Sequence, residues 1–474
     1  MEQMSAVSDI FAEVLRRVRP SADERNLLHG FVERLLVDLN RKLKDAGIEA
    51  SAQIHGSVAK DTWLRGDRDL DVFIVLKRTH SRSIFPKVLE VVKQLVVNGW
   101  TEAYAEHPYI KAEKEGYSID FVPCFEMDES GTLLSATDRT PLHTDYVKEH
   151  FTGEMKDEVL LLKRFMHGID CYGAEVKIGG FSGYLCELLL VRYGTFLRVI
   201  EAARDWRPPM VIDFSGFWEK KGEQFQKLFG TSALVVIDPV DLERNVASAV
   251  AESKLWLFVA ASRRFMESPC LDFFFSPTVL CLDEESLRNR IEHLGVNFVF
   301  LVLSLKKRYV PDVLWGQLKK AESSVKRLLE RNDFKVIRTK VWSDEDSYHV
   351  LLFELESATL SRTRLHMGPP VEMHSMSDKF LIKHVGSGKV VSGPWIEGKR
   401  WWAEAIREPS DARTLLETRL REDGGVSVGV PKGLAMNLVS FTILIDDEIM
   451  EIYRGRKEFA VSLTEFLKGK PSWL

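Results

Sequence analysis

Two aspartates at the start of an apolar run are the residues of this chain best suited to bind a metal. Asp69 and Asp71 open DLDVFIVL (69–76), whose β-branched and apolar residues predict a buried strand. Side chains two residues apart on a strand share a face, so the two carboxylates point the same way. Neighbouring carboxylates repel each other unless a cation lies between them, and hard oxygen ligands suit Mg²⁺. The spacing therefore predicts a divalent-metal site at the start of this strand.

The turn that precedes this strand is suited to phosphate. Gly56 and Ser57 come just before a helix-compatible run, residues 58–64. Such a turn leaves backbone N–H groups at a helix start, where they and the positive end of the dipole favour an anion. An Asp-x-Asp pair alone is common and equally fits two solvated aspartates at a strand end. The order of turn, short helix and acidic strand is more specific, and it predicts a phosphate site beside a metal site.

A third acid fits the same site. Asp120 lies in the alternating run YSIDFVP (117–123), and Lys114-Glu115-Gly116 predicts a hairpin that joins this strand to residues 109–112. A single acid in an otherwise apolar sheet costs free energy unless it has a partner. The order of turn, short helix and acidic strand resembles the signature of the DNA polymerase β-like nucleotidyltransferases, which implies a third carboxylate on a neighbouring strand. By that resemblance Asp120 would complete one catalytic and metal-binding set with Asp69 and Asp71.

The composition is ordinary for a soluble globular protein, and the length of 474 residues predicts several domains. The net charge of -5 means that any nucleic-acid surface must be a local patch. The five cysteines form no CxxC pair, which fits a reducing cytoplasm and gives no zinc or disulfide framework. We find neither a signal peptide nor an apolar run long enough to span a membrane. The expected location is the cytoplasm, without a membrane partner.

The periodicity predicts a mixed α/β region followed by a helical one. In residues 1–148 the expected helices are 6–18, 22–46 and 84–98, and the expected strands are 50–55, 69–76, 107–113 and 117–123. Residues 149–268 look helical, with Asp238–Ala247 as a loop leading into a helix. Farther on, strands near 296–304 and 350–355 flank a helix at about 315–332.

Two later features could contact nucleic acid. Residues 305–340 contain eleven Lys and Arg against four Asp and Glu, a net charge of +7. This segment is either a phosphate-binding surface or simply a solvated helix face. Trp395, Trp401 and Trp402 would stack on bases if exposed, but we expect at least two of them in a buried sheet.

Together these stretches resemble the archaeal-type (class I) CCA-adding enzymes, tRNA nucleotidyltransferases of the DNA polymerase β-like superfamily. The resemblance covers nearly the whole chain and rests on GSVAKDTWLRGDRDLDVF (56–73), AEHPYIKAEKEGYSIDFVPCF (105–125), TDRTPLH (137–143), YGAEVKIGGFSGYLCELL (172–189) and DPVDLERNVA (238–247). Weaker similarity lies in SRTRLHMGPP (361–370) and GKRWWAEAIRE (398–408).

The resemblance implies an α+β multidomain protein with a polymerase β-like nucleotidyltransferase head, a mixed sheet with helices. The implied domains are the catalytic head (1–148), a helical, nucleotide-binding neck (149–268), an α/β body (269–318 and 392–474) and a tRNA-binding tail (319–391). It also implies that Asp69, Asp71 and Asp120 hold two Mg²⁺ ions.

The resemblance further assigns nucleotide-binding roles. Ser57 and Lys60 would bind the phosphates of the nucleotide. The triphosphate and sugar would be lined by His143, Lys163 and Tyr172. Arg244 would help select the base. Family members often have Arg at the position of Lys60 and Glu at that of Asp69. Lysine keeps the charge but lacks the bidentate fork of arginine, which puts the strength of that phosphate contact in question.

Structural roles remain open for several of these residues. Lys163 could be a helix-surface cation, Tyr172 a capping aromatic and His143 a structural histidine. Arg244 could simply pair with Glu243 or Asp241.

The implied activity is addition of C, C and A to the 3′ end of tRNA from CTP and ATP, without a nucleic-acid template. A homodimer is compatible with the resemblance, although the sequence does not define the oligomeric state. One alternative is another untemplated RNA nucleotidyltransferase, such as a poly(A) polymerase that uses ATP alone. Another is a catalytically silent RNA-binding protein, but such a protein would have no use for a costly cluster of three acids.

Overall fold

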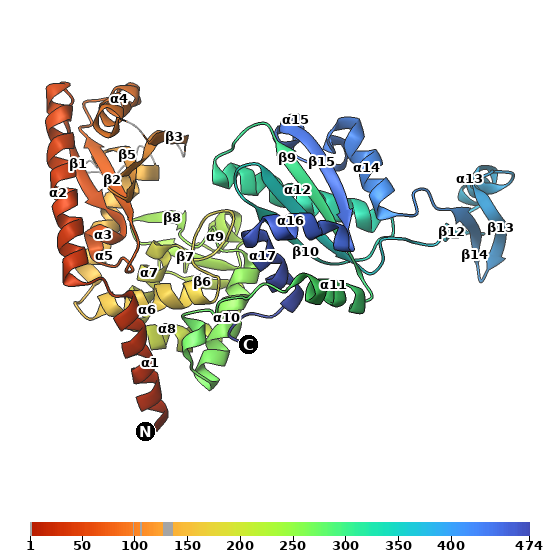
Figure 1. Ribbon diagram of the computed structural model, residues 1–474, viewed down its shortest axis with the longest axis horizontal. Helices are drawn as coiled ribbons and strands as arrows, with labels where there is room; N and C mark the ends of the chain where they lie inside the picture. The colour runs from red at the N-terminus through yellow and green to blue at the C-terminus, as the bar shows by residue number, and fades with distance from the viewer. Residues whose placement is uncertain (1, 98, 105–106, 127–135) are drawn as a thin grey trace. The chain divides into compact units, whose positions relative to one another are not determined.

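A computed structural model describes residues 2–97, 99–104, 107–126 and 136–474 (Figure 1). The chain divides into two compact units, residues 1–277 with 471–474 and residues 278–470. Each unit has its own sheets and its own apolar cores. No helix in the described ranges is long and apolar enough to cross a membrane.

The first unit begins with a five-stranded sheet and its helices. The elements are α1 (Glu2–Val18), α2 (Ala22–Asp45), β1 (Ala50–His55), α3 (Gly56–Lys60), β2 (Asp69–Leu76), α4 (Phe85–Val96), β3 (Trp100–Tyr104), β4 (Pro108–Lys114) and β5 (Tyr117–Phe125). The strand order is β1-β2-β5-β4-β3, and only β2 and β5 pair in parallel. This confirms the predicted helices and strands to within a few residues, as well as the hairpin before Asp120.

Strand β2 separates an apolar face from a polar one. Leu70, Val72, Ile74 and Leu76 are buried in one core with apolar residues of α2 and α4. Because side chains alternate along a strand, Asp69 and Asp71 lie on the opposite face. Strand β3 was not predicted from the sequence, and its mostly exposed residues explain why no apolar period marks it.

The rest of the first unit packs helices against a small sheet. Its elements are α5 (Arg139–His150), α6 (Met155–Gly168), α7 (Gly183–Tyr193), α8 (Phe196–Ala203), β6 (Met210–Ile212), α9 (Gly222–Phe229), β7 (Leu234–Asp238), β8 (Asp241–Asn245) and α10 (Glu252–Glu267). Helices α6, α7, α8 and α10 share a core rich in phenylalanine, which α1 also joins.

The predicted all-helical character of residues 149–268 is wrong in one place. Strands β6, β7 and β8 form a three-stranded sheet, and Asp238–Ala247 contains a hairpin instead of a loop leading into a helix. All five residues of β7 are buried, and periodicity cannot distinguish so short an apolar run from a buried helical segment. The side chain of Asn245 fixes the hairpin by accepting from the Val236 amide and donating to the Leu234 carbonyl oxygen.

The second unit contains a four-stranded antiparallel sheet and a three-stranded one. Its elements are α11 (Glu284–His293), β9 (Asn297–Leu305), α12 (Pro311–Arg331), β10 (Val336–Ser343), β11 (Tyr348–Leu355), β12 (Thr363–Pro370), α13 (His374–His384), β13 (Val390–Glu397), β14 (Arg400–Ile406), α14 (Ala412–Asp423), α15 (Lys432–Asn437), β15 (Leu438–Ile445), α16 (Met450–Gly455) and α17 (Lys457–Lys468). The sheet orders are β10-β11-β9-β15 and β12-β14-β13.

Both predicted strands and the predicted helix in this region are confirmed, as β9, β11 and α12. Helices α12 and α14 share a core with one face of the larger sheet, and α16 and α17 share a core with the other. Trp395, Trp401 and Trp402 lie in the smaller sheet, but all three are only half-buried, so the expected full burial of two of them is wrong.

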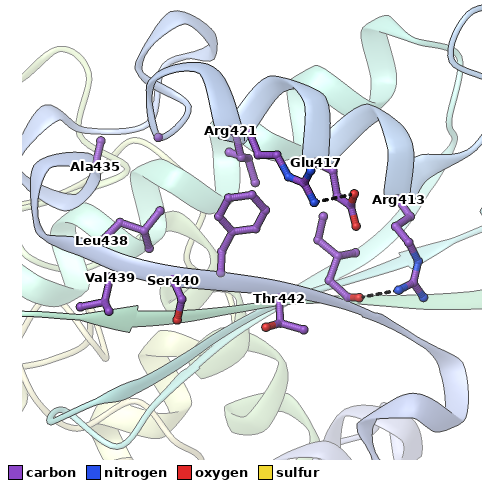
Figure 2. A pocket seen from close by; sticks show the side chains of 12 residues that line it. Arg413, Glu417, Arg421, Ala435, Leu438, Val439, Ser440 and Thr442 are labelled. Atoms are coloured by element: carbon purple, nitrogen blue, oxygen red, sulfur yellow. Dashed lines mark hydrogen bonds and ion pairs between the residues drawn. The ribbon is translucent and has the colours of Figure 1, made fainter.

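A groove of about 510 Å³ runs along the edge strand β15 beside α14 (Figure 2). The two arginines of α14 that line it already have partners. Arg413 donates to the Ile443 carbonyl oxygen at 3.0 Å, and Arg421 donates to Glu417 at 3.2 Å (Figure 2). Arg413 is ion-paired with Glu448 and Arg421 with Glu417, so neither arginine offers an uncompensated charge to a ligand.

Candidate active site

The three predicted metal-binding carboxylates come from adjacent strands of the first sheet. In the parallel pairing of β2 with β5, Asp71 is the register partner of Asp120, and Asp69 lies two residues before Asp71. The pKa of Asp71 is raised by burial and then by the negative charges of Asp120 and Asp69. Burial also raises the pKa of Asp120, with a further increase from Asp69. These carboxylates repel one another, so a bound cation would relieve the repulsion.

Lys111 is an unpredicted member of this cluster. It lies on β4 opposite Asp120, and its Nζ is 3.1 Å from Asp120 Oδ2. Within the described residues, no three His, Cys, Asp or Glu side chains are arranged closely enough to hold a metal ion. The fit of this cluster to a divalent cation therefore depends on the negative charge of the three acids. The carboxylate of Asp120 is paired with the ammonium group of Lys111.

The turn before β2 brings the backbone directly against Asp71. Gly56 has a φ of +65°, and a Cβ atom at this position would lie 2.0 Å from Asp71 Oδ2. Only glycine tolerates both the positive φ and this close approach. Helix α3 then runs only to Lys60, shorter than the predicted 58–64, and carries Ser57 in its first turn.

Most of the predicted nucleotide-binding residues line one cavity of about 370 Å³ in the first unit. The lining residues are Gly56, Ser57, Lys60, Asp71, Phe73, Thr140, His143, Thr144, Lys163, Tyr172, Gly183, Tyr184 and Glu187. They come from segments that are distant in sequence, mainly α3, β2, α5, α6 and α7. Arg244, Asp69 and Asp120 are not among the lining residues.

One wall of the cavity holds two lysines around a buried glutamate. Glu187 is paired with Lys60, and its Oε1 lies 3.8 Å from Lys163 Nζ. Lys163 is 2% exposed, so it is not the helix-surface cation that remained open from the sequence. Burial raises the pKa of Glu187, but the two ammonium groups outweigh this effect and hold the pKa below its usual value.

A second buried carboxylate joins His143 to Arg244. Asp238 is fully buried; its Oδ2 accepts from His143 Nε2 at 2.8 Å and from Arg244 Nη1 at 2.7 Å. Its Oδ1 accepts from the Tyr184 hydroxyl at 3.2 Å. Arg244 therefore pairs with Asp238, and neither of the partners considered from the sequence, Glu243 and Asp241, holds it. Asp241 instead pairs with Arg139 at 2.8 Å.

The contacts of His143 and Tyr172 bear on whether these residues are structural or line the cavity. Burial lowers the pKa of His143, while the hydrogen bond to Asp238 raises it, and the net pKa lies below the usual value. The neutral ring then donates from Nε2 and keeps Nδ1 as an acceptor. The Tyr172 ring packs against the His167 ring at an angle of 32°, with centroids 4.2 Å apart, and it lines the cavity. Both residues thus border the cavity as well as supporting its walls.

The fold and the site define a nucleotidyltransferase. Residues 33–143, which contain the acidic strands and the turn, match the family model described as a nucleotidyltransferase domain. Residues 157–275 match the second domain of tRNA nucleotidyltransferase, and residues 296–435 match the C-terminal domain of the CCA-adding enzyme. The predicted α+β multidomain fold with a polymerase β-like head is thereby confirmed.

Similarity to curated relatives shows which family of nucleotidyltransferases the chain belongs to. It is 36% identical to the CCA-adding enzyme of Methanosarcina acetivorans over 89% of this chain and 91% of the relative. It is 35% identical to the CCA-adding enzyme of Methanothermobacter thermautotrophicus over 96% of this chain and 97% of the relative. It is also 35% identical to that of Methanopyrus kandleri, over 98% of this chain and 98% of the relative. The chain belongs to the CCA-adding enzyme family, and it is an enzyme, a nucleotidyltransferase.

Proposed function

We propose that this chain adds C, C and A to the 3′ end of tRNA, using CTP and ATP and no nucleic-acid template. The observation that carries the proposal is the cavity that brings Ser57, Lys60 and Lys163 beside Asp71. A triphosphate in that cavity would have cations at its phosphates and an acidic cluster next to its reacting phosphorus. The family membership supplies tRNA as the acceptor.

The proposed reaction is an in-line displacement at the α-phosphorus. The 3′-hydroxyl oxygen of tRNA forms the new bond to phosphorus as the bond to the bridging oxygen of pyrophosphate breaks, and Asp120 accepts the hydroxyl proton. Two divalent ions held by Asp69, Asp71 and Asp120, with Mg²⁺ as the proposed metal, would lower the pKa of the hydroxyl and neutralise the leaving group. Ser57, Lys60 and Lys163 would hold the triphosphate, while His143 and Tyr172 would border its sugar.

Arg244 is the proposed base-reading residue. Its guanidinium has five donors, of which Nη1 is committed to Asp238, so others remain to meet acceptors on cytosine or adenine. Because Asp238 is buried and also bonded to His143, the orientation of the fork is fixed before a nucleotide arrives. A fixed set of donors can reject a base that presents the wrong edge.

The second unit would bind the tRNA. The division into head, neck, body and tail remains a prediction, as do a homodimer and a cytoplasmic location. The segment 305–340, with its net charge of +7, is the proposed contact for the phosphate backbone.

The decisive experiment supplies tRNA that lacks its 3′ CCA with CTP, ATP or both, in the presence of Mg²⁺, and sequences the products. We expect two C residues with CTP alone and a complete CCA with both nucleotides. Chelation of divalent ions should stop all addition. Incorporation of A residues from ATP alone onto tRNA that ends before CC would indicate the poly(A) activity instead and overturn the proposal.

A further inference from the structure

Glu187 is a buried carboxylate that the motif analysis did not single out. It lies on α7, is 1% exposed and belongs to the wall of the cavity. Burying a carboxylate costs free energy unless the group is paired and hydrogen-bonded. Glu187 meets this requirement with partners from two other parts of the first unit.

The contacts of Glu187 join three segments of the chain. Lys60, at the end of α3, forms an ion pair with Oε2, and Thr62 Oγ1 donates to Oε1 at 2.8 Å. Lys163, on α6, places Nζ 3.8 Å from Oε1. Glu187 therefore connects α7 with α6 and with the segment that follows the phosphate-binding turn.

Lys163 depends on the same cluster. Its Nζ donates to the Thr62 carbonyl oxygen at 2.8 Å, and Thr62 Oγ1 lies 3.4 Å away. These hydrogen-bond partners of Lys163 Nζ are uncharged oxygens, and Glu187 is the carboxylate with which it pairs. One carboxylate thus partners both ammonium groups at this wall of the cavity.

A lysine needs such an anchor more than an arginine does. Its ammonium is a point charge on a flexible four-carbon stem, whereas the planar guanidinium of arginine is preorganised. Fixing Lys60 and Lys163 before a nucleotide binds removes part of the entropy loss that triphosphate binding would otherwise incur.

We propose that Glu187 is a positioning residue for the triphosphate, which holds the ammonium groups of Lys60 and Lys163 at one wall of the cavity. The proposal rests on the proposed function, because it takes the cavity as the nucleoside triphosphate site. It assigns no contact between Glu187 and the substrate, since two like charges would repel. The role of Glu187 is therefore in binding the phosphates and is the same for CTP and ATP.

The test replaces Glu187 by glutamine, which keeps the volume and removes the charge. We expect KM for CTP and for ATP to rise together by about tenfold, the factor that corresponds to one lost charge-assisted hydrogen bond. The change in kcat should be much smaller. Equilibrium binding without tRNA should show weaker affinity for CTP but nearly unchanged affinity for CMP, because CMP lacks the β- and γ-phosphates.

Glu354→Gln is the matched control. Glu354 is also buried and ion-paired, with Arg338 Nε at 2.6 Å, but it lies on β11 of the second unit. This variant should leave KM for both nucleotides and the CTP and CMP affinities unchanged. If Glu187→Gln fails to fold, Thr62→Val removes one hydrogen bond to Glu187 at nearly constant volume, and we expect the same pattern with a smaller rise in KM.

Equal losses of CTP and CMP affinity would overturn the proposal, because they would indicate a general distortion of the pocket. An unchanged KM with a lowered kcat would overturn it as well. The binding measurements require no turnover, so they test Glu187 even if the wild-type protein fails to build CCA on tRNA. That latter failure would contradict the proposed function alone.

Discussion

At the scale of single residues, two buried carboxylates organise the candidate nucleotide site. Glu187 holds Lys60 and Lys163, and Asp238 holds His143 and Arg244. Both groups reach the cavity, the first through Lys60 and Lys163 and the second through His143, whereas Arg244 lies on β8 outside its lining. The placement of Arg244 predicts that base selection can be impaired without loss of phosphate binding.

Asp71→Asn is the sharpest test of the acidic cluster. The substitution removes the charge and little volume, so the fold and the affinity for tRNA should remain close to those of the wild type. Nucleotide transfer should fall by at least two orders of magnitude, because the metal ligand on the shared face is lost. Single-turnover rates at saturating Mg²⁺ measure this effect. Retention of more than a few per cent of the rate would contradict the metal assignment.

Arg244→Ala should relax base selection. Removing the fork leaves acceptors on the base unpaired, which should cost about 1–3 kcal/mol of discrimination against UTP and GTP. The measurement is the ratio of kcat/KM values for the four nucleotides on tRNA ending before, within and after CC. Lys163→Ala is the comparison variant and should impair all four nucleotides alike. A common factor for all four nucleotides in Arg244→Ala would make Arg244 a structural or phosphate-binding residue.

Asp238→Asn tests whether Arg244 must be held in place. The variant keeps the volume but removes the charge that orients the guanidinium. We expect the discrimination ratios to shift in the same direction as in Arg244→Ala, with a smaller amplitude. Asp238 also contacts His143, but we expect it to affect base choice through Arg244. The double variant should therefore add little to the loss of base discrimination in Arg244→Ala. Full additivity in the double variant would show that Asp238 acts independently of Arg244.

At the scale of elements, helix α12 separates its apolar and charged faces clearly. Leu314, Leu318, Val325 and Leu329 are buried in the core beneath the sheet, while Lys319, Lys320 and Arg327 are exposed. Several cations of the +7 segment outside this helix form ion pairs within the second unit. Arg338, for example, pairs with Glu354. The exposed cations of α12 are thus the better candidates for RNA phosphates.

Replacing Lys319, Lys320, Lys326 and Arg327 by serine should weaken tRNA binding and flatten its dependence on salt. Each lost phosphate contact should lower the slope of log Kd against log salt by roughly one unit or less. The control removes four cations from α2 of the first unit, Arg34, Arg41, Lys42 and Lys44, and should leave the slope unchanged. Identical slopes for the wild type and the α12 variant would mean that these cations face only solvent.

At the scale of the whole molecule, each unit has its own core and so its own response to pH. In the second unit His349 is fully buried on β11, and its Nδ1 lies 2.7 Å from Ser343 Oγ. Burial lowers the pKa of His349 more than Asp344 and Asp346 raise it. The unfolded chain therefore binds a proton at this position before the folded chain does, and stability is lost as the pH falls below about 6.5.

Thermal or urea unfolding of the full chain between pH 7 and pH 5 measures this loss. His349 can contribute a slope of at most about 1.4 kcal/mol per pH unit to the unfolding of the second unit. In His349→Asn, whose side-chain amide can replace Nδ1 as the partner of Ser343 Oγ, the slope should be flatter. His29→Asn, a change at an exposed histidine of α2, should retain the wild-type slope. Equal slopes in all three proteins would show that His349 does not control this transition.

Local patterns in the sequence were sufficient for the acidic half of the site. The β-branched and apolar run at 69–76 predicted β2, and the alternation at 117–123 with the turn before it predicted β5, because these signals depend on a few neighbouring residues. The motif resemblance also selected residues that line one cavity, among them Ser57, His143 and Tyr172. The roles of these residues in binding nucleotide stay predictions.

Only the tertiary structure identified the groups that hold these residues in place. Lys60 is 127 positions from Glu187, and His143 is 95 positions from Asp238. An ion pair between such distant segments leaves no periodic signal, because it depends on how helices and strands pack and not on the spacing of neighbours. Lys111 was not predicted for a related reason. Its contact with Asp120 depends on the register of β4 against β5. Local sequence thus predicted the strands and the turn that carry the candidate site residues. The buried carboxylates and the lysine that contact those residues became visible only in the tertiary structure, because folding brings distant charges together in a low-dielectric interior.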